Sequence, residues 1–348
     1  MNFQISDRAI GPGQSCYVIA EAGVNHNGEL ALAKQLVDVA VAAGADAVKF
    51  QTFKAELLAS AAAPKANYQQ VTTEAAESQL DMLRRLELSP EAHRVLLDYC
   101  RERGIQFLST PFEEGSADFL ESLGVAAYKL PSGELTNLPF LDHVARKSRP
   151  LIVSTGMSTL GEVETALQTI ARAGNPPVAL LHCVSNYPAD PAQTNLRAML
   201  TLQAAFGVPV GYSDHTPGIE VALAAVALGA CIVEKHFTLD KNLPGPDHQA
   251  SSEPDELKAL IRGIRKVEAS LGDGRKVPAM SEANTAAVGR KSLIAACDLV
   301  AGTVLGENHI AIKRPGNGLP PAARPYVSGR TLKVAVRAGE VLSLDMFV

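Results

Sequence analysis

Two histidines stand near the ends of consecutive apolar runs in the second half of the chain. His215 falls in PVGYSDHT and His236 in CIVEKHFT. If these runs are neighbouring parallel strands, about 4.8 Å apart, two inward-facing imidazoles could hold one divalent ion and leave coordination positions open. Imidazole with oxygen ligands suits Mn²⁺, Co²⁺ or Zn²⁺. The spacing is also compatible with a hydrogen-bonded histidine pair that holds no metal.

Two lysines lie near the ends of earlier runs, Lys49 in DAVKFQTF and Lys129 in AAYKLPSG. A buried lysine without an anionic partner is costly or loses its proton. Lysines beside hydroxyl groups form a cradle for phosphate or carboxylate. The hydroxyl residues at comparable positions are Thr110, Ser132, Ser154 and Ser213. A lysine–glutamate ion pair and a Schiff-base lysine are the alternatives.

Two glutamates, Glu21 and Glu134, also stand at the ends of apolar runs. In a site that holds a metal and an anion, a carboxylate can act as general acid or base. Either glutamate could instead neutralise a lysine. Tyr187 in NYP and Asp247 in PGPDH are weaker candidates, because both motifs are ordinary turn sequences. Arg314 in KRPGNG could equally be a solvated surface side chain.

These residues fall on a chain that alternates short apolar runs with longer stretches of helical spacing. The apolar runs cover 16–23, 46–53, 105–112, 126–133, 150–157, 178–185, 209–216 and 231–238. Gly44 and Gly104 follow two of the helical stretches as terminators. The pattern predicts an α/β fold, a (β/α)8 TIM barrel, with the active site at the C-terminal strand ends. An open doubly wound sheet is the alternative, but no GxGxxG follows the first run.

Composition excludes several classes of protein. With 47% hydrophobic and 20% charged residues, the 348-residue chain can bury a large core. Its net charge of −5 argues against a nucleic-acid partner, and no apolar run approaches the ~18 residues of a membrane span. The N-terminus has no signal-peptide pattern, which favours the cytoplasm. The five cysteines are scattered without CxxC, so we expect buried thiols and no disulfides.

The pattern changes after the helical stretch 256–272. Residues 273–290 are polar without helical or strand period, and 291–348 contain short strands and turns. We therefore predict a barrel domain at 1–272, a linker at 273–290 and a small module at 291–348. Because a module of that size is marginally stable alone, it should dock on another surface, in this chain or a partner's.

Taken in order, the motifs along nearly the whole chain resemble the sialic acid synthase family. The matching pieces are EAGVNHNG, KFQT, STPF, YKLPSGE, VSTGM, LLHCVSNYP, GYSDHT, EKHFTLD, PGPDH and KRPGNG. The resemblance implies a TIM barrel followed by an antifreeze-like SAF domain. It implies condensation of phosphoenolpyruvate with N-acetylmannosamine and water, giving a nine-carbon 2-keto acid, N-acetylneuraminate, and phosphate. A legionaminate synthase using 2,4-diacetamido-trideoxymannose is the alternative. The pseudaminate branch is further away, since its first motif differs at Gly23 and Val24.

The resemblance also implies roles for individual residues. It implies metal ligands at His215 and His236, with Mn²⁺ expected and Mg²⁺ or Co²⁺ possible, and acid–base carboxylates at Glu21 and Glu134. Phosphoenolpyruvate contacts fall on Lys49, Thr110, Lys129, Ser132, Ser154, Ser185 and Ser213, where some members have asparagine in place of Ser185. Sugar contacts fall on Gln51, Asn67, Tyr187, Asp247 and Arg314.

The implied assembly is a domain-swapped homodimer in which the SAF domain covers the partner's barrel and Arg314 meets the partner's sugar. In the implied reaction the metal polarises the aldehyde, the enol carbon attacks it, and water adds at C2 with Glu134 or Glu21 as base. Phosphate then leaves by C–O cleavage. Two competing readings remain: a barrel synthase for a sugar phosphate, which would need further cations, and a non-catalytic carbohydrate- or ice-binding protein.

Overall fold

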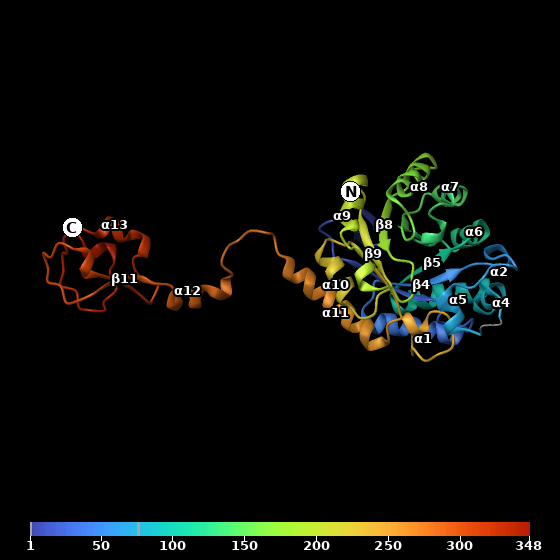
Figure 1. Ribbon diagram of the computed structural model, residues 1–348, viewed down its shortest axis with the longest axis horizontal. Helices are drawn as coiled ribbons and strands as arrows, with labels where there is room; N and C mark the ends of the chain where they lie inside the picture. Colours follow the sequence, from blue (N-terminus) through green and yellow to red (C-terminus); the bar gives the residue numbers. More distant parts are fainter. Residues whose placement is uncertain (1, 75–76) are drawn as a thin grey trace. The chain divides into compact units, whose positions relative to one another are not determined.

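The computed structural model describes residues 2–74 and 77–348. They divide into two compact units, one that ends at Gly272 and one that spans Asp273–Val348. The first unit is drawn in blue to orange and the second in orange to red (Figure 1). No helix in the described ranges is long and apolar enough to cross a membrane.

Eight parallel strands form the centre of the first unit. They are β3 (Tyr17–Gly23), β4 (Ala47–Thr52), β5 (Gln106–Pro111), β6 (Tyr128–Leu130), β7 (Leu151–Ser154), β8 (Val178–Cys183), β9 (Val210–Asp214) and β10 (Ile232–His236). The first strand, β3, pairs with the last, β10, and β5 lies beside β6. The strands therefore close into the predicted barrel rather than an open sheet.

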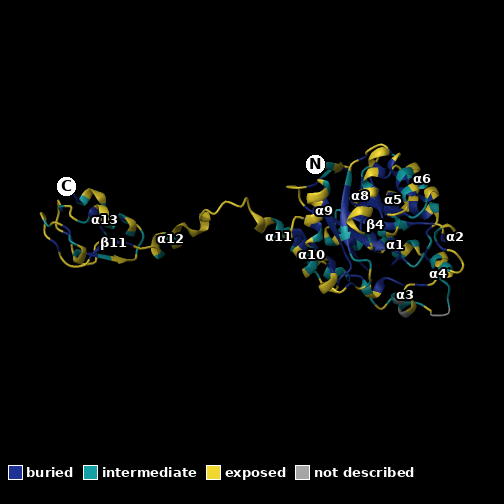
Figure 2. Ribbon diagram, turned by 45° about the horizontal axis from the view of Figure 1, so that its top comes forward, coloured by how far each residue is buried: buried dark blue, intermediate teal, exposed yellow. Residues whose placement is uncertain are grey.

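Each strand is followed by a helix on the outside of the barrel. These helices are α1 (Leu30–Ala43), α5 (Pro90–Arg103), α6 (Glu114–Ser122), α7 (Leu138–Ala145), α8 (Leu160–Arg172), α9 (Ala198–Phe206), α10 (Glu220–Ala227) and α11 (Pro254–Leu271). Gly44 and Gly104 end α1 and α5 in the left-handed conformation, as predicted. The strands are buried, whereas the outward faces of the helices are exposed (Figure 2).

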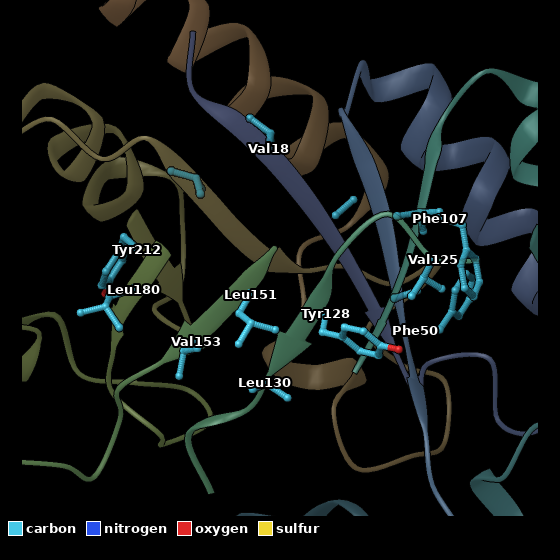
Figure 3. Close-up of a cluster of buried hydrophobic side chains, with 14 of the residues drawn as sticks. Val18, Phe50, Phe107, Val125, Tyr128, Leu130, Leu151, Val153, Leu180 and Tyr212 are labelled. Carbon is cyan, nitrogen blue, oxygen red and sulfur yellow. The ribbon is translucent and has the colours of Figure 1, made fainter. Parts of the chain in front are cut away.

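The main core lies between the strands and these helices. Outward side chains such as Phe50, Tyr128 and Val153 pack there (Figure 3). A second apolar cluster fills the lower interior of the barrel, where Ile19, Leu108 and Ile232 meet. Because side chains alternate along a strand, the next inward positions towards the C-terminal ends lie above this cluster, and they are the polar ones.

A hairpin that the sequence analysis did not predict closes the N-terminal end of the barrel. Strands β1 (Phe3–Ile5) and β2 (Arg8–Ile10) pair antiparallel, and Ile5 and Ile10 pack into the interior cluster. Arg8 forms an ion pair with Asp46, which also pairs with Arg265 of α11. The hairpin therefore seals the end opposite the predicted site.

The connection from β4 to α5 is long and carries three short helices, α2 (Ala55–Leu58), α3 (Asn67–Thr72) and α4 (Gln79–Leu86). Lys65 holds the middle of this connection, because its buried ammonium donates to Thr73 Oγ1 at 2.9 Å and to the Glu74 carbonyl at 2.8 Å. The connection lies at the C-terminal end of the strands and contributes one side of the site described below.

The second unit is small and has its own core. Strands β11 (Ser292–Ala295) and β12 (Ile310–Lys313) pair antiparallel, and a short helix α13 (Arg324–Val327) follows. The core gathers Leu293, Leu305, Leu332 and Phe347 among others.

One helix was not expected from the sequence, and the prediction for one cysteine was wrong. The stretch 273–290 contains a helix, α12 (Ala283–Gly289), although it shows no amphipathic period. Its alanines favour helix by intrinsic propensity, which a search for buried faces does not detect. Of the five cysteines, which are all free, Cys297 is exposed rather than buried.

Candidate active site

Strand register brings the predicted polar side chains together at the C-terminal end of the barrel. Glu21 of β3 lies beside His236 of β10 on one side and Lys49 of β4 on the other. Glu234 of β10 lies beside Ser213 of β9. All five side chains line one cavity of about 400 Å³.

Two lysines and two carboxylates form a buried ion-pair network at the bottom of the cavity. Lys49 contacts Glu21 directly and lies 3.7 Å from Glu234, while Lys129 lies 3.6 Å from the other oxygen of Glu234. Thr110 Oγ1 accepts from the Lys49 ammonium at 3.0 Å. All four charged side chains are at most 5% exposed, so their interactions are only weakly screened.

The network shifts the pKa values of the two carboxylates in opposite directions. Burial raises the pKa of Glu21 above its ordinary value, because the attraction of Lys49 only partly offsets desolvation. Burial acts on Glu234 as well, but Lys129 and Lys49 outweigh it and hold the pKa of Glu234 low. Ser213 also donates to Glu234 Oε1 at 2.9 Å. Glu234 is therefore the permanent counter-charge, and Glu21 is the carboxylate that can gain or lose a proton near neutrality.

Lys129 is only partly satisfied in this network. Its ammonium has three donors, and one of them bonds the Leu130 carbonyl at 3.1 Å. Glu234 at 3.6 Å is an ion-pair partner beyond good hydrogen-bond distance. Burial lowers the pKa of Lys129. An anion that entered the cavity would complete its hydrogen bonds and favour its charged form.

Small side chains create a nest beside Lys129. The Gly156 amide donates to Ser132 Oγ at 2.9 Å, and Ser132 Oγ lies 3.1 Å from Cys183 Sγ. A Cβ at Gly156 would come within 2.8 Å of Ser132 Oγ and would collide with Ser185 Oγ. Ser154 Oγ is buried with no hydrogen-bond partner in the described part of the chain. Several hydroxyls thus converge on a space that glycine keeps open, which is the chemistry of an anion cradle.

The two predicted histidines face each other across the top of β9 and β10. Their ring centroids are 5.6 Å apart. His215 Nδ1 bonds the Val184 carbonyl at 2.7 Å, and His236 Nδ1 is buried without a partner among the described residues. Burial lowers the pKa of both rings, so both are neutral, which is the form that binds metal.

The imidazole pair fits a divalent ion with open positions, held by two nitrogen ligands. Within residues 2–74 and 77–348 there is no cluster of three or more histidine, cysteine or acidic side chains with metal-binding geometry. A closed structural site is therefore not built here, and any ion would take its remaining ligands from water or substrate.

Aromatic side chains cover the histidines. The centroid of the Tyr187 ring lies 4.2 Å from that of His215 and 5.6 Å from that of His236. The ring centroid of Tyr68, in α3, lies 5.1 Å from that of Tyr187. Asp247 also lines the cavity, and burial raises its pKa to about 6. Tyr68 and Tyr187 are only partly buried, so these groups form the outer part of the cavity, above the charged nest.

Most of the predicted site residues line this single cavity. They are Glu21, Lys49, Gln51, Thr110, Lys129, Ser132, Ser154, Ser185, Tyr187, Ser213, His215, His236 and Asp247.

Two other predicted residues are not among these lining residues, and the side chain of a third is not described. Glu134 lies in a 3-10 turn (Ser132–Glu134) after β6, accepts from Asn137 Nδ2 at 2.6 Å and is not among the lining residues. Arg314 belongs to the second unit, where its Nε donates to the Gly289 carbonyl. The side chain of Asn67 lies outside the described residues.

The prediction missed several lining residues. Glu234 is the most important, and its signal was present, since it shares the inward face of its strand with His236. Tyr68 and the apolar residues Leu58, Leu83 and Phe112 also line the cavity. Three of these four lie in the long connection after β4, where no strand period marks an inward position.

The fold and the cavity define a class, a (β/α)8-barrel enzyme with an anion nest and an imidazole pair at its C-terminal strand ends. The chain belongs to the NeuB family, whose model matches residues 36–276, and residues 290–348 match the SAF domain. The predicted sialic acid synthase family, barrel and SAF domain are thereby confirmed. The chain is an enzyme, a transferase of the sialic acid synthase type.

Known relatives and a solved structure are similar to this chain along most of its length. An N,N'-diacetyllegionaminic acid synthase of Legionella pneumophila is 48% identical over 95% of this chain and 94% of its own length. The human N-acetylneuraminate-9-phosphate synthase is 35% identical, over 97% of this chain and 94% of its own. The crystal structure of an N-acetylneuraminic acid (sialic acid) synthetase from Leptospira borgpetersenii, in complex with citrate, is 34% identical with a TM-score of 0.72, covering 82% of this chain and 95% of that one.

Proposed function

We propose that this enzyme is a legionaminate synthase, which condenses phosphoenolpyruvate with 2,4-diacetamido-2,4,6-trideoxymannose and water. The products are a nine-carbon 2-keto acid and phosphate. The 48% identity to a diacetyllegionaminic acid synthase favours this sugar over N-acetylmannosamine, which the sequence analysis preferred. The observation that carries the proposal is the buried nest in which Lys49 and Lys129 share Glu234 beneath an imidazole pair.

The nest suits an enol phosphate. Phosphoenolpyruvate brings a phosphate and a carboxylate, and Lys129, with unused donors, lies beside the open hydroxyl nest at Gly156. Charge-assisted hydrogen bonds from lysine and serine to phosphate oxygens are among the stronger polar contacts in proteins. Lys49 already contacts Glu21 and Thr110. We therefore assign it to binding the carboxylate and the enol oxygen of phosphoenolpyruvate rather than to Schiff-base chemistry.

The carbon–carbon bond forms when C3 of the enol attacks the sugar aldehyde, whose oxygen takes up a proton. Positive charge then develops at C2. Water adds at C2 and gives its proton to a carboxylate, and the C–O bond to phosphate breaks to leave the ketone. Glu21 is better suited than Glu134 as this base, because Glu21 lines the cavity and burial raises its pKa towards neutrality.

We propose Mn²⁺ as the bound metal, with Mg²⁺ or Co²⁺ as alternatives. His215 and His236 would hold it, since both rings are neutral and buried beside the cavity. When bound, the ion supplies Lewis-acid polarisation of the aldehyde oxygen. Tyr187, tilted against His215 and edge-on to His236, would limit the access of bulk water to this point.

The charge of the cavity favours an unphosphorylated sugar. Among the described residues that line it, the only lysines or arginines are Lys49 and Lys129, and both lie at the deep end with carboxylate partners. A second phosphate in the outer part would therefore find no cation among the described residues of this chain that line the cavity. This supports a product without the 9-phosphate that is named for the human relative.

We also propose a cytoplasmic homodimer in which Arg314 reaches the sugar of the other subunit. The five free cysteines suit a reducing compartment. Arg314 lies in the residues that match the SAF domain, within the motif KRPGNG. Its side chain is exposed and, among the described residues, donates a hydrogen bond only to the Gly289 carbonyl.

The test is a phosphate-release assay with phosphoenolpyruvate, Mn²⁺ and each of the two sugars. We expect phosphate release with both and a higher kcat/KM for the diacetamido sugar. A higher kcat/KM for N-acetylmannosamine would overturn the assignment of the sugar, and release with neither would overturn the enzyme assignment. In ¹⁸O-labelled water the label should enter the C2 oxygen of the keto acid and not the phosphate.

A further inference from the structure

The cavity has two chemically different sides. The strand ends supply the lysines, most of the carboxylates and the serines, whereas the connection after β4 and the turn after β5 supply uncharged side chains, most of them apolar, with the polar ends of Tyr68, Gln69 and Gln79 among them. Leu58 ends α2, Leu83 lies in α4 and Phe112 follows β5. All three line the cavity and are only partly buried, so each keeps one face towards the open space.

A separate small core supports this apolar side. Leu58, Leu83 and Phe112 pack against a buried cluster that includes Met82 and Leu86. Phe53 of the same cluster packs edge to face on Phe112, with ring centroids 6.0 Å apart. The apolar surface is therefore held in place by packing and is not a flexible edge that could turn away from a ligand.

The charged residues of the same connection point elsewhere. Arg84, next to Leu83 in the sequence, pairs with Glu56 at 2.8 Å and is about half exposed. Lys54 pairs with Glu87, and neither lines the cavity. The connection is rich in ionic side chains, yet within its described residues it turns none of them towards the substrate space. This side of the cavity is thus uncharged although the local sequence is rich in ionic residues.

We propose that Leu58, Leu83 and Phe112 form a methyl-selecting wall that receives the deoxygenated C6 end of the sugar. This inference rests on the proposed function and adds the residues that choose the substrate. The 6-deoxy sugar has a methyl group at C6, where N-acetylmannosamine has a hydroxymethyl group. Against the wall the methyl is removed from water at no polar cost, while a hydroxyl would lose its water and find no hydrogen-bond partner on the three wall side chains.

The size of the expected selection follows from similar pockets. One methyl or hydroxyl difference in an apolar pocket changes kcat/KM by about 10- to 200-fold. In the proposed reaction the lysines, serines and histidines act on phosphoenolpyruvate and on the aldehyde, which are the same with both sugars, so we expect them to contribute little to this ratio. The wall is therefore the main source of discrimination at C6.

The test compares Leu83→Asn with a matched surface control, Leu57→Asn. Asparagine is close to leucine in size and offers a partner to a hydroxyl. Leu57 neighbours the wall in α2 but is 67% exposed and does not line the cavity. We measure kcat/KM for both sugars at saturating phosphoenolpyruvate. The ratio of diacetamido sugar to N-acetylmannosamine should fall about tenfold or more in Leu83→Asn and stay unchanged in Leu57→Asn.

Leu58→Asn serves as a second variant in case Leu83→Asn does not fold, and Leu83→Met should keep the wild-type ratio. An unchanged ratio in the folded wall variants, or an equal loss with both sugars, would overturn the wall. The wild-type ratio tests the proposed function separately. A wild type that prefers the diacetamido sugar, with wall variants that keep its ratio, would refute the wall and leave the function standing.

Discussion

Replacing Gly156 by alanine should block the anion nest without disturbing the barrel. The added Cβ would lie 2.8 Å from Ser132 Oγ and 2.9 Å from Cys183 Sγ, and it would also collide with Ser185 Oγ. These are contacts that real Cβ atoms do not make, so the side chains must rotate away. The colliding atoms are the ends of small side chains that face the cavity, and the fold can therefore absorb the change.

The magnitude follows from the hydrogen bonds that are lost. A hydrogen bond to a charged group contributes about 1.5–3 kcal/mol, so the loss of one or two serine contacts to phosphate costs ~3 kcal/mol. That corresponds to an increase of about 100-fold in the KM for phosphoenolpyruvate. The assay is phosphate release with phosphoenolpyruvate as the varied substrate, accompanied by a thermal melt.

The matched control is Gly161→Ala in α8, where an added Cβ meets nothing within 4 Å. It should leave the KM unchanged and, as a glycine-to-alanine change in a helix, slightly raise the melting temperature. If Gly156→Ala kept a KM within about threefold of the wild-type value while folding normally, the nest at Gly156 would not be where the phosphate binds.

Three further predictions concern stability, pH and the outer cavity. Lys235, buried and 2.7 Å from buried Asp214, should be needed for stability: Lys235→Met should lower the free energy of unfolding by about 3–5 kcal/mol in urea titrations, and adding Asp214→Asn should recover most of the loss, because it removes the unpaired charge. Burial raises the pKa of Asp247 to about 6. The stability that its protonated form contributes is therefore fully present below pH ~4 and is lost as the pH rises through ~6. Asp247→Asn should therefore gain ~3 kcal/mol over the wild type at pH 8 and almost nothing at pH 4; an equal gain at both would refute the argument. Lys65→Met removes the donors that hold Thr73 and Glu74, and it should raise the sugar KM while calorimetry shows an unchanged Kd for phosphoenolpyruvate; an equal weakening of both would contradict this role.

The barrel and most of its site could be predicted because both follow from one alternating pattern. Each strand is apolar at its start and polar at its end, and inward positions recur every second residue. That rule placed Lys49, Ser213 and His236 correctly in the cavity. It failed at Glu134, because β6 stops at Leu130 and the next residue is proline, so the alternation no longer fixes where side chains point.

Other features carried too little local signal. The hairpin β1–β2 consists of two three-residue strands, too short for an alternation to stand out. The wall residues Leu58 and Leu83 lie on short helices of an irregular connection, and only tertiary packing decides which of their faces meets the cavity. Glu234 differs from these, since its register beside Ser213 follows directly from the strand assignment. The sugar could not be chosen from the sequence, because the two candidates differ at C4 and C6 and no single strand-end residue distinguishes them.

The most direct test of the account is a crystal structure with Mn²⁺ and phosphoenolpyruvate bound, with manganese located by anomalous scattering. The account predicts one manganese peak coordinated by both His215 and His236, with the phosphate against Ser132 and Lys129. Manganese bound elsewhere, imidazoles turned away from a common ion, or a phosphate outside the nest would contradict it.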